Sequence, residues 1–365
     1  MAADKSRQIN YAVAAFVADI GAVRAVGSLG DGNINDTFLV EFHDRPSVVL
    51  QRINSTVFPD PRGVAANSAR ISHHMATENG AEIIPDHGYR FPAVISTVDG
   101  SDWFEDADGE VWRGQRYVGN AVSYRHVAVD HAAFEAGRLL AYYHRKLASF
   151  DHHALSVPLP GFHDLQGYRA AYVEAVRMHK REHTPALAYC RDAAARCLEL
   201  PTLPERAAAG GGRVQVIHGD TKYDNFLFDA DSGRAVALID LDTTAPGLTA
   251  ADIGDCLRSF CNPGGEKSAR AVVFDIGICR RLVAGYQSAA SMNSAERNLI
   301  YHGVHVMTCE LGFRFLTDYL ENDRYFKVTD GEENLRRATV QFKLLESIEA
   351  QRSTIESIAG GASNG

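Results

Sequence analysis

The sequence predicts an α+β fold, with an antiparallel sheet in the first third of the chain and a mainly helical region after it. Short runs of alternating apolar and polar residues, separated by turns that contain Gly and Asp, fill residues 1–118. Apolar residues then recur at helical spacing through most of residues 119–357. Within that second region, two apolar runs, 226–228 and 235–239, flank an Asp-Ser-Gly turn and predict a β-hairpin.

The composition excludes several classes of protein. A length of 365 residues allows two domains or one two-lobed fold, and 45% hydrophobic with 23% charged residues is typical of a globular chain. A net charge of −9 argues against a nucleic-acid partner, because such proteins need a basic surface. No run approaches the ~18 apolar residues of a membrane span, and the polar first ten residues do not resemble a signal peptide. We therefore expect no membrane partner.

The six cysteines form no Cys-x-x-Cys pair, which argues against a zinc site and favours buried free thiols in a reducing compartment. We expect a cytoplasmic protein that is a monomer or a small homo-oligomer. The last residues, 358–365, are small and polar, and we expect a disordered tail there.

The first region is expected to begin with a helix over residues 9–22, because its apolar residues follow a helical period. A glycine-rich turn then separates two strands within residues 26–40. The other elements expected here are a strand at 47–53, a helix at 61–79, and strands at 93–98 and 111–117.

In the second region we expect helices at residues 130–149, 168–179, 185–198, 272–287, 298–318 and 332–350, with a flexible link at 207–212. Asp252 stands at the start of a further apolar helix that runs through Cys261, a position where an aspartate commonly caps a helix. His144, on the first of these helices, is expected to be a packed group rather than a metal ligand.

The predicted hairpin carries polar residues at one end. Asp220 and Asn225 precede its first strand, and Asp240 follows its second. A carboxylate that accepts a hydroxyl proton, next to an amide oxygen and a second carboxylate, suits phosphoryl transfer from a magnesium nucleotide. Polar turn residues are common in ordinary hairpins, but the full spacing from His218 to Asp240 is much more specific. The sequence therefore predicts a kinase that uses ATP and Mg²⁺.

The pattern His-x-Asp-x-x-x-x-Asn, followed by an apolar residue and Ile-Asp, resembles the catalytic and metal-binding loops of the protein-kinase-like superfamily. Its form here is similar to that of the aminoglycoside phosphotransferase-like small-molecule kinases. The resemblance implies a bilobal protein-kinase-like fold, with an antiparallel-sheet lobe at residues 1–118 and a helical lobe at residues 119–357.

The same resemblance assigns roles to the polar residues. It implies that Asp220 is the catalytic base and that Asn225 and Asp240 bind Mg²⁺, with Asp242 in support. In related kinases an aspartate at the position of Asp252 supports the catalytic loop by hydrogen bonding, so we expect that role here rather than a cap.

The resemblance also places the nucleotide against the first lobe. Glycine lets backbone N–H groups approach phosphate oxygens, so the turn from Gly30 to Asn35 is expected to cover them. Protein kinases hold a phosphate with a lysine on the third strand, whereas this strand offers Gln51 or Arg52. The expected nucleotide-binding residues are Gly30, Gly32, Asn33, Asn35 and Gln51, together with Arg116, Tyr117 and Val118 at the hinge that leaves the sheet.

From about Gly27 to Glu349 the chain resembles bacterial N-acetylhexosamine 1-kinases, which phosphorylate the anomeric hydroxyl of free N-acetylglucosamine or N-acetylgalactosamine. The similar segments include Gly30–Asn35, Asn54–Asp60, Phe162–Asp164, Asp220–Lys222 and Cys309–Phe326. The last segment is the most specific, and it implies that Arg314 and Tyr325 hold the sugar that Asp220 activates. The alternative role for Arg314 is a surface ion pair with Asp318, one helical turn on.

Three alternatives stay open on the sequence alone. The first is a kinase for another small molecule, such as an aminoglycoside, methylthioribose or homoserine. The second is a nucleotide-binding pseudokinase, suggested by the missing lysine and opposed by the intact Asp220, Asn225 and Asp240. The third is a protein kinase, which the short stretch from Asp242 to Asp252 disfavours because it has no room for an activation segment.

Overall fold

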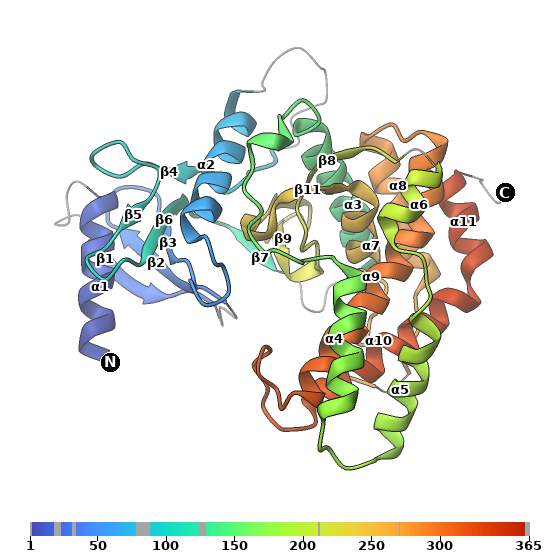
Figure 1. Cartoon of the computed structure of the whole chain (residues 1–365). Coiled ribbons are helices and arrows are strands. Elements are labelled where there is room, and N and C mark those ends of the chain that lie inside the picture. The colour runs from blue at the N-terminus through green and yellow to red at the C-terminus, as the bar shows by residue number, and fades with distance from the viewer. Residues whose placement is uncertain are drawn as a thin grey trace. The chain divides into compact units, whose positions relative to one another are not determined.

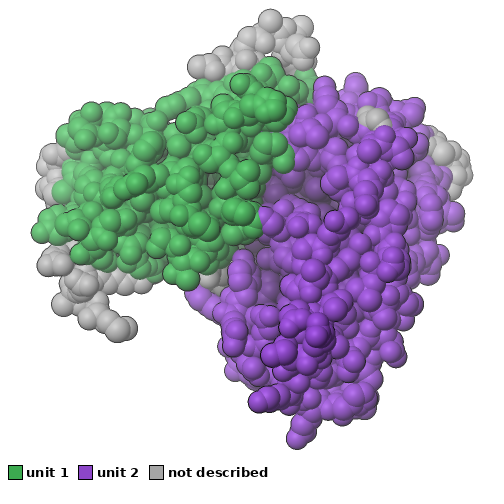
Figure 2. Space-filling model, in the orientation of Figure 1, with its two compact units in different colours: residues 1–123, 145–160, 226–246 green, residues 124–144, 161–225, 247–365 purple. Residues whose placement is uncertain are grey.

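A computed structural model describes residues 2–17, 23–30, 34–77, 88–123, 129–210, 212–269 and 271–361. The chain forms two compact units, each assembled from three segments (Figure 2). Unit 1 consists of residues 1–123, 145–160 and 226–246, and unit 2 of residues 124–144, 161–225 and 247–365. The units therefore interleave along the sequence, whereas the two expected lobes are consecutive stretches. Each unit has a hydrophobic core of its own.

Unit 1 is built on an antiparallel sheet (Figure 1). The strand order is β1 (Val23–Ser28), β2 (Asp36–Phe42), β3 (Val48–Arg52), β6 (Val111–Arg116) and β4 (Val94–Ile95), and β5 (Phe104–Glu105) also pairs with β6. All of these pairings are antiparallel. The predicted sheet is therefore confirmed, although β4 is shorter than the stretch 93–98 expected for it.

Two helices cover opposite faces of this sheet. α1 (Ala2–Phe16) packs its apolar residues against Trp112, and α2 (Pro61–Thr77) packs against Val111. Because successive residues of a strand point to opposite faces, Arg113 lies on the same side as Val111, towards α2. A charged side chain is thereby buried between the sheet and a helix, where it needs polar partners.

A smaller sheet in the same unit contains the predicted hairpin. β7 (Ala121–Ser123) pairs with β9 (Phe226–Asp229), which pairs with β10 (Ala235–Leu238). Both hairpin strands end within one residue of the expected bounds, and β10 is buried along its whole length. The hairpin prediction is confirmed. A further two-stranded sheet, of β8 (Val214–Ile217) and β11 (Ala245–Leu248), was not expected from the sequence.

Unit 2 is helical and is organised around α9 (Ser294–Leu320), which contacts α4, α5, α6, α7, α10 and α11 (Figure 1). The helices of this region are α3 (Val129–Lys146), α4 (Leu165–Met178), α5 (Pro185–Cys197), α6 (Leu203–Gly210), α7 (Thr249–Phe260), α8 (Ile276–Ala289), α10 (Glu333–Ala350) and α11 (Arg352–Gly360). Of the short 3₁₀ turns, η3 (Tyr223–Asn225) belongs to unit 2, and η2 (His152–Ala154) and η4 (Leu241–Thr243) belong to unit 1. The predicted α+β fold is confirmed.

Two helices occupy stretches where the sequence predicts none. α6 continues through Gly210 and buries Ala207 in the core, so the flexible link expected at 207–212 is wrong. α11 runs to Gly360 and buries Ile358 and Ala359, so the first residues of the expected disordered tail are helical instead. Residues 362–365 lie outside the described residues.

α7 and α9 approach each other closely because both have a glycine at the crossing. A Cβ on Gly303 would lie 2.0 Å from the Ala250 carbonyl oxygen, and a Cβ on Gly254 would lie 2.2 Å from the Gly303 carbonyl carbon. Neither gap admits a methyl group, since nonbonded carbons pack at about 3.5–4.0 Å. The glycines therefore fix α7 directly against α9. In the described part of the chain, every helix is too short or too polar for a membrane crossing.

Candidate active site

The predicted catalytic sequence follows β8 as a loop whose backbone is held by one buried carboxylate. Asp252, in α7, accepts hydrogen bonds from the backbone N–H groups of His218 (2.7 Å) and Gly219 (2.8 Å). Gly219 has a φ of 84°, a conformation that residues with a side chain rarely adopt. The N-cap of α7 is Leu248, not Asp252. The expectation that Asp252 supports the catalytic loop is therefore confirmed.

Asp252 is held as an anion by a second layer of contacts. Its carboxylate lies 2.8 Å from Nε2 of His144, whose Nδ1 lies 2.8 Å from the Tyr286 hydroxyl. Burial raises the pKa of Asp252, but hydrogen bonding and charge from His144, with help from His218, bring it below its ordinary value. His144 is thus a packed, hydrogen-bonded group, as expected, and it ties α3 to the catalytic loop.

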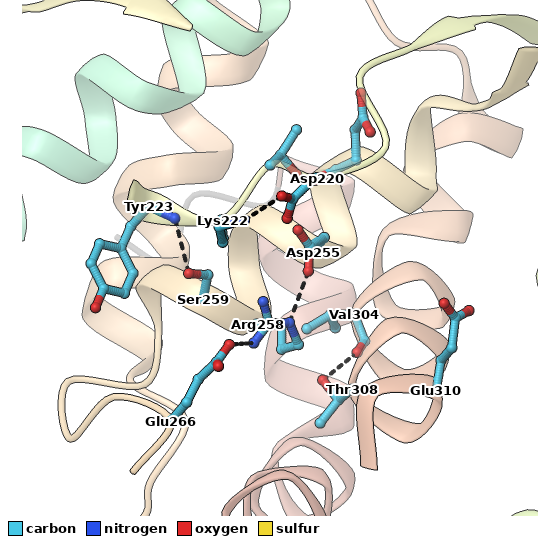
Figure 3. A network of polar contacts seen from close by, with 12 residues as sticks. Asp220, Lys222, Tyr223, Asp255, Arg258, Ser259, Glu266, Val304, Thr308 and Glu310 are labelled. Atoms are coloured by element: carbon cyan, nitrogen blue, oxygen red, sulfur yellow. Dashed lines mark hydrogen bonds and ion pairs between the residues drawn. The ribbon is translucent and has the colours of Figure 1, made fainter. Parts of the chain in front are cut away.

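Asp220 forms an ion pair with Lys222, as Figure 3 shows. Asn225 uses its side-chain nitrogen to donate to the Asp220 carbonyl oxygen (2.7 Å) and carboxylate (3.2 Å), which leaves its amide oxygen to act as a ligand. Burial raises the pKa of Asp220, yet Lys222, His218 and Arg258 together lower it below the ordinary value. Asp220 is therefore ionised at neutral pH, as a proton acceptor must be. Lys222 lies in a motif that the sequence singled out, but it was given no role there.

A second chain of charges begins on α7, near the loop, and ends at Glu266 beyond that helix (Figure 3). Arg258 is 3% exposed and donates to Asp255 (2.8 Å) and Glu266 (3.0 Å). Burial lowers the pKa of Arg258, but these two carboxylates raise it well above its ordinary value. The other Asp255 oxygen, Oδ2, is buried and has no hydrogen-bond partner among the described residues.

Asp318 organises the turn that follows α9. Its carboxylate accepts hydrogen bonds from the backbone N–H groups of Arg324 (2.8 Å), Tyr325 (2.7 Å) and Phe326 (2.9 Å). These contacts occupy both carboxylate oxygens, and no ion pair between Asp318 and Arg314 is present. The alternative role of Arg314 as a surface ion-pair partner is therefore wrong.

Arg314 instead stands among aromatic rings. Its guanidinium carbon lies 5.2 Å from the ring centre of Phe162, 5.6 Å from that of Tyr168, 5.8 Å from that of Tyr325 and 5.4 Å from that of Phe326. Within the described part of the chain, this guanidinium makes no ion pair or hydrogen bond. Tyr325 is 51% exposed. The structure thus places the two predicted sugar-binding residues side by side, with the donors of Arg314 unused.

In unit 1, a buried arginine that the sequence analysis missed connects several predicted site residues. Arg113 is 1% exposed, pairs with Asp242, and donates to Oε1 of Gln51 (2.7 and 3.0 Å). It also donates to the Ser68 hydroxyl on α2 (2.7 Å). The second Asp242 oxygen accepts a hydrogen bond from the Asn35 side chain. In the sequence, Arg113 is one arginine within a predicted strand, and nothing near it indicates that it is buried among polar partners.

Three residues that the sequence predicts to bind nucleotide or metal therefore use both polar atoms of their side chains in contacts within the protein. Gln51 also donates to the Thr37 hydroxyl (3.1 Å), and Asn35 also accepts from the Asn54 backbone N–H (3.0 Å). Asp242 uses one oxygen for Arg113 and the other for Asn35. This geometry gives the three a bracing role between the large sheet and η4.

The remaining nucleotide candidates are less constrained. Gly30 has a φ of 69° and open space around its α-carbon, which suits a turn that approaches phosphate. Gly32 and Asn33 lie outside the described residues. Arg52, the other candidate for the lysine position, pairs with Asp36 on β2.

The expected hinge begins where β6 ends, at Arg116. The backbone N–H of Arg116 donates to the Ala93 carbonyl (2.8 Å), and that of Tyr117 donates to the Ser47 carbonyl (3.1 Å). Val118 is buried in a small apolar cluster with β10. The segment leaves the large sheet as predicted and enters β7; its contact with adenine stays a prediction.

The predicted metal ligands are divided between the two units. Asn225 belongs to unit 2, whereas Asp240 and Asp242 belong to unit 1. Asp240 is exposed and has a φ of 68°, a strained conformation that an aspartate tolerates and that is frequent at functional sites. Across the described ranges, no group of three or more His, Cys, Asp and Glu side chains is placed to hold a metal. Mg²⁺ commonly takes only one or two protein oxygens, and the assignment of Asn225 and Asp240 as its ligands stays a prediction.

Comparisons with known proteins are consistent with this geometry. The sequence profile described as the APH phosphotransferase enzyme family matches residues 26–290. An aminoglycoside phosphotransferase from Alicyclobacillus acidocaldarius is similar in structure, with a TM-score of 0.62 and 16% identity over 95% of this chain and 96% of that one. A choline/ethanolamine kinase family protein from Mesorhizobium loti has a TM-score of 0.62 and 16% identity over 97% and 98%.

A third similar structure, of the amicoumacin kinase hAmiN in complex with AMP-PNP, Ca²⁺ and Ami, has a TM-score of 0.58 and 12% identity over 98% of this chain and 94% of that one. At such identities the similarity concerns the fold, which is kinase-like.

Proposed function

The chain belongs to the phosphotransferase enzyme family, and we propose that it transfers the γ-phosphoryl group of ATP to the anomeric hydroxyl of a free N-acetylhexosamine. The family and the kinase-like fold support phosphoryl transfer to a small molecule. The acceptor is inferred from the charges and rings around Arg314, together with the resemblance of the segment Cys309–Phe326 to N-acetylhexosamine 1-kinases.

The charges near the catalytic loop favour a neutral acceptor. Asp220 pairs with Lys222, and Asp255 pairs with Arg258. Glu310, on α9, lies 2.8 Å from a ring nitrogen of His163. Each of these carboxylates therefore has a basic partner within unit 2, whereas Arg314 makes no direct ion pair among the described residues, and the charges of Glu310 and Asp220 act on it only from a distance. Arg258 also pairs with Glu266, which in turn pairs with Arg337. With these two included, the cations still outnumber the carboxylates by one, so an acceptor that carries an ammonium group is disfavoured.

The aromatic rings around Arg314 carry the proposal. A cage of aromatic faces is the structure with which proteins bind quaternary ammonium ligands. In this protein the cage already contains a cation of its own, the Arg314 guanidinium. That arrangement removes the site for an external ammonium and offers hydrogen-bond donors beside the exposed ring of Tyr325. A sugar has an apolar face for such a ring, and its hydroxyl and acetamido oxygens accept hydrogen bonds.

The residues of the catalytic loop supply the remaining chemistry. Asp220 accepts the proton of the anomeric hydroxyl and orients its oxygen for attack on the γ-phosphorus. An anomeric hydroxyl is more acidic than an ordinary alcohol, so a carboxylate that stays ionised suffices. Lys222 and Asn225 keep that carboxylate charged and fixed in direction.

Asn225 and Asp240 are the residues that would hold Mg²⁺, because both offer hard oxygen ligands. When bound, Mg²⁺ neutralises charge on the β- and γ-phosphates. Asp242 is better suited to fixing the turn after β10, since protein donors already occupy both of its oxygens. The nucleotide lies against the turn that begins at Gly30, with adenine at the segment Arg116–Val118.

The proposal is tested by comparing N-acetylglucosamine, N-acetylgalactosamine, glucose, glucosamine, choline and an aminoglycoside as acceptors, with NMR identification of the phosphorylated atom. We expect phosphate on C1 of the N-acetylated sugars and little turnover of glucosamine, the cationic match to N-acetylglucosamine. Preferred phosphorylation of choline or the aminoglycoside would replace the proposal by the amine-kinase alternative. Absence of metal-dependent ADP release with every acceptor would support the pseudokinase.

A further inference from the structure

His163 is a strained residue that contacts both α9, the helix that carries Arg314, and the loop that leads into Asp220. It precedes α4 and has a φ of 60°, in the left-handed region that few non-glycine residues adopt. Its Nδ1 lies 2.8 Å from a carboxylate oxygen of Glu310 on α9, and its Nε2 lies 2.7 Å from the carbonyl oxygen of Gly219. Backbone strain of this kind persists only where surrounding contacts enforce it, and it is concentrated at functional sites.

The two partners of His163 fix its protonation state. A carboxylate oxygen and a carbonyl oxygen are both acceptors without a hydrogen to give. A neutral imidazole has a single N–H and would direct a lone pair at one of these oxygens. With Glu310 as a carboxylate, both contacts are hydrogen bonds only when both ring nitrogens carry hydrogen, so the geometry favours an imidazolium–carboxylate pair.

The surroundings of His163 favour that charge. Burial lowers the pKa of His163, but Glu310, the Gly219 carbonyl and the negative charge of Asp255 on α7 raise it to about 9. Tyr168, on α4, interacts with the His163 backbone. The pKa of Tyr168 is about 12, raised first by burial, so its phenol is neutral at the same pH and adds no charge.

The Gly219 carbonyl belongs to the peptide group that leads into Asp220. The N–H of this peptide group is that of Asp220, and its nitrogen lies 3.2 Å from Nδ1 of His218. The preceding peptide N–H, that of Gly219, is held by Asp252 at 2.8 Å. His163 therefore supplies the contact that fixes the carbonyl edge of the peptide group next to the catalytic carboxylate.

We propose that His163 is a positioning residue: as an imidazolium ion it holds the Gly219 carbonyl, and through Glu310 it couples the direction of Asp220 to the acceptor-binding helix. Glu310 stands one helical turn before Arg314, and its second oxygen, Oε2, is buried without a hydrogen-bond partner in the described residues. That oxygen is placed to accept a hydrogen bond from the acceptor. This coupling rests on the proposed role of Arg314 as the acceptor ligand, whereas the charge of His163 does not.

The charge of His163 is tested by NMR of the protein with ¹⁵N-labelled histidine, in which the His163 signals are assigned by comparison with His163→Asn. Asparagine tolerates the left-handed backbone, so the variant is expected to fold. At pH 7.5 we expect both ring nitrogens of His163 in the protonated range, with titration near pH 9. A neutral ring at pH 7.5 would overturn the proposal, whichever acceptor the enzyme uses.

The positioning role is tested by kinetics with a matched control. In the wild type, deprotonation of His163 leaves one N–H for two hydrogen-bond acceptors, the Glu310 carboxylate and the Gly219 carbonyl. The negative charge of Glu310 keeps that hydrogen on Nδ1. The bond to Gly219 is then lost, so kcat should fall about tenfold between pH 8 and pH 10. In Glu310→Gln the amide can donate to Nδ1 while the Nε2 hydrogen stays on Gly219, so this alkaline loss should disappear.

The control is Glu349→Gln, which alters another histidine–carboxylate pair that involves α9: His305 on α9 lies 2.9 Å from Glu349 on α10. It should keep the wild-type pH profile. His163→Asn should lower kcat about 100-fold, with little change in the KM for ATP, as expected for a misplaced catalytic group. An alkaline loss that is the same in Glu310→Gln and the wild type, or a His163→Asn enzyme with full kcat, would contradict the positioning role. These comparisons work with any acceptor that is phosphorylated, so they fail or succeed separately from the hexosamine assignment.

Discussion

The two units contain buried polar networks that differ in what they leave unused. In unit 1, the side chains of Arg113, Asp242, Gln51 and Asn35 serve as partners for one another. In unit 2, the loop around Asp220 is held as firmly, but some polar groups near it have no hydrogen-bond partner among the described residues. These groups are the guanidinium of Arg314, Oδ2 of Asp255 and Oε2 of Glu310.

We interpret the network of unit 1 as structural and the groups near Asp220 in unit 2 as part of a binding site. A buried polar atom without a partner costs about 1–3 kcal/mol, so a fold selected for stability alone would avoid several in one place. The network of Arg113 is therefore expected to control stability. The groups around Arg314 are expected to control acceptor binding and to leave stability nearly unchanged.

The largest expected effect on activity comes from Asp220→Asn. The amide keeps the shape of the side chain but cannot accept the proton, so kcat should fall by about 10³-fold. Binding of a fluorescent ATP analogue should persist, which distinguishes lost chemistry from a lost site. Retained turnover would remove Asp220 from the mechanism.

The largest expected effect on stability comes from Arg113→Met. The change leaves Asp242 charged and buried without its cation, and such losses cost about 3–5 kcal/mol. The control is Arg24→Met, which removes an ion pair with Glu41 that is largely exposed, with side-chain exposures of 55% and 34%. It should change the free energy of unfolding, measured by urea denaturation, by less than about 1 kcal/mol. Equal effects of the two variants would show that the buried network is not a brace.

An intermediate effect is expected from Arg314→Met, which keeps the length of the side chain and removes its charge. The KM for the sugar should rise about 10–100-fold, because hydrogen bonds from a charged donor are lost. The melting temperature should change little, since Arg314 makes no ion pair in the described structure. Tetramethylammonium should inhibit the variant and not the wild type, because the aromatic cage has lost its internal cation. A large drop in stability with an unchanged KM would place Arg314 in the scaffold instead.

The smallest effect concerns Glu333, at the start of α10. Hydrogen bonds from Lys267 and Thr329 lower the pKa of Glu333 from its ordinary 4.5 to about 2. Ionised Glu333 therefore stabilises the fold above about pH 4.5, and this contribution is lost as the pH falls towards 2. Glu333→Gln should reduce the free energy of unfolding at pH 7 by about 1 kcal/mol or less, because the Lys267 partner is 70% exposed. The curves of variant and wild type should converge near pH 2; a constant difference at all pH values would assign the effect to packing.

The elements that the sequence predicted well are those whose signal is local. The hairpin of β9 and β10 follows from apolar runs and an Asp-Ser-Gly turn, and α9 follows from a long apolar period. α11 was missed because its nine residues hold few apolar side chains and run into the small, polar end of the chain, from 358 on, that was expected to be a tail. Packing against α8 and α9 is what buries Ile355 and Ile358. Propensity is a weak guide where tertiary packing decides.

Only part of the site was predicted, because here too the sequence signals only contacts between residues that are close in the chain. Asp220 and Asn225 are five positions apart in a recognisable pattern, and the structure joins them by hydrogen bonds. Arg113 binds Asp242 across 129 positions, and nothing near either residue signals the pair. The role of His163 became evident only when the structure showed its left-handed backbone and its two hydrogen-bond acceptors, Glu310 and the Gly219 carbonyl.

The central proposal is that the enzyme binds the anomeric carbon of a free sugar next to a metal-bound triphosphate, for which Asn225 and Asp240 are the proposed metal ligands. Mn²⁺ in place of Mg²⁺, with a non-hydrolysable ATP analogue and excess N-acetylglucosamine, tests it through paramagnetic broadening of the sugar ¹H signals. The account predicts that H1 is broadened most and that Asp240→Asn abolishes the effect. Strongest broadening at H6, or none while the sugar is bound, would contradict it.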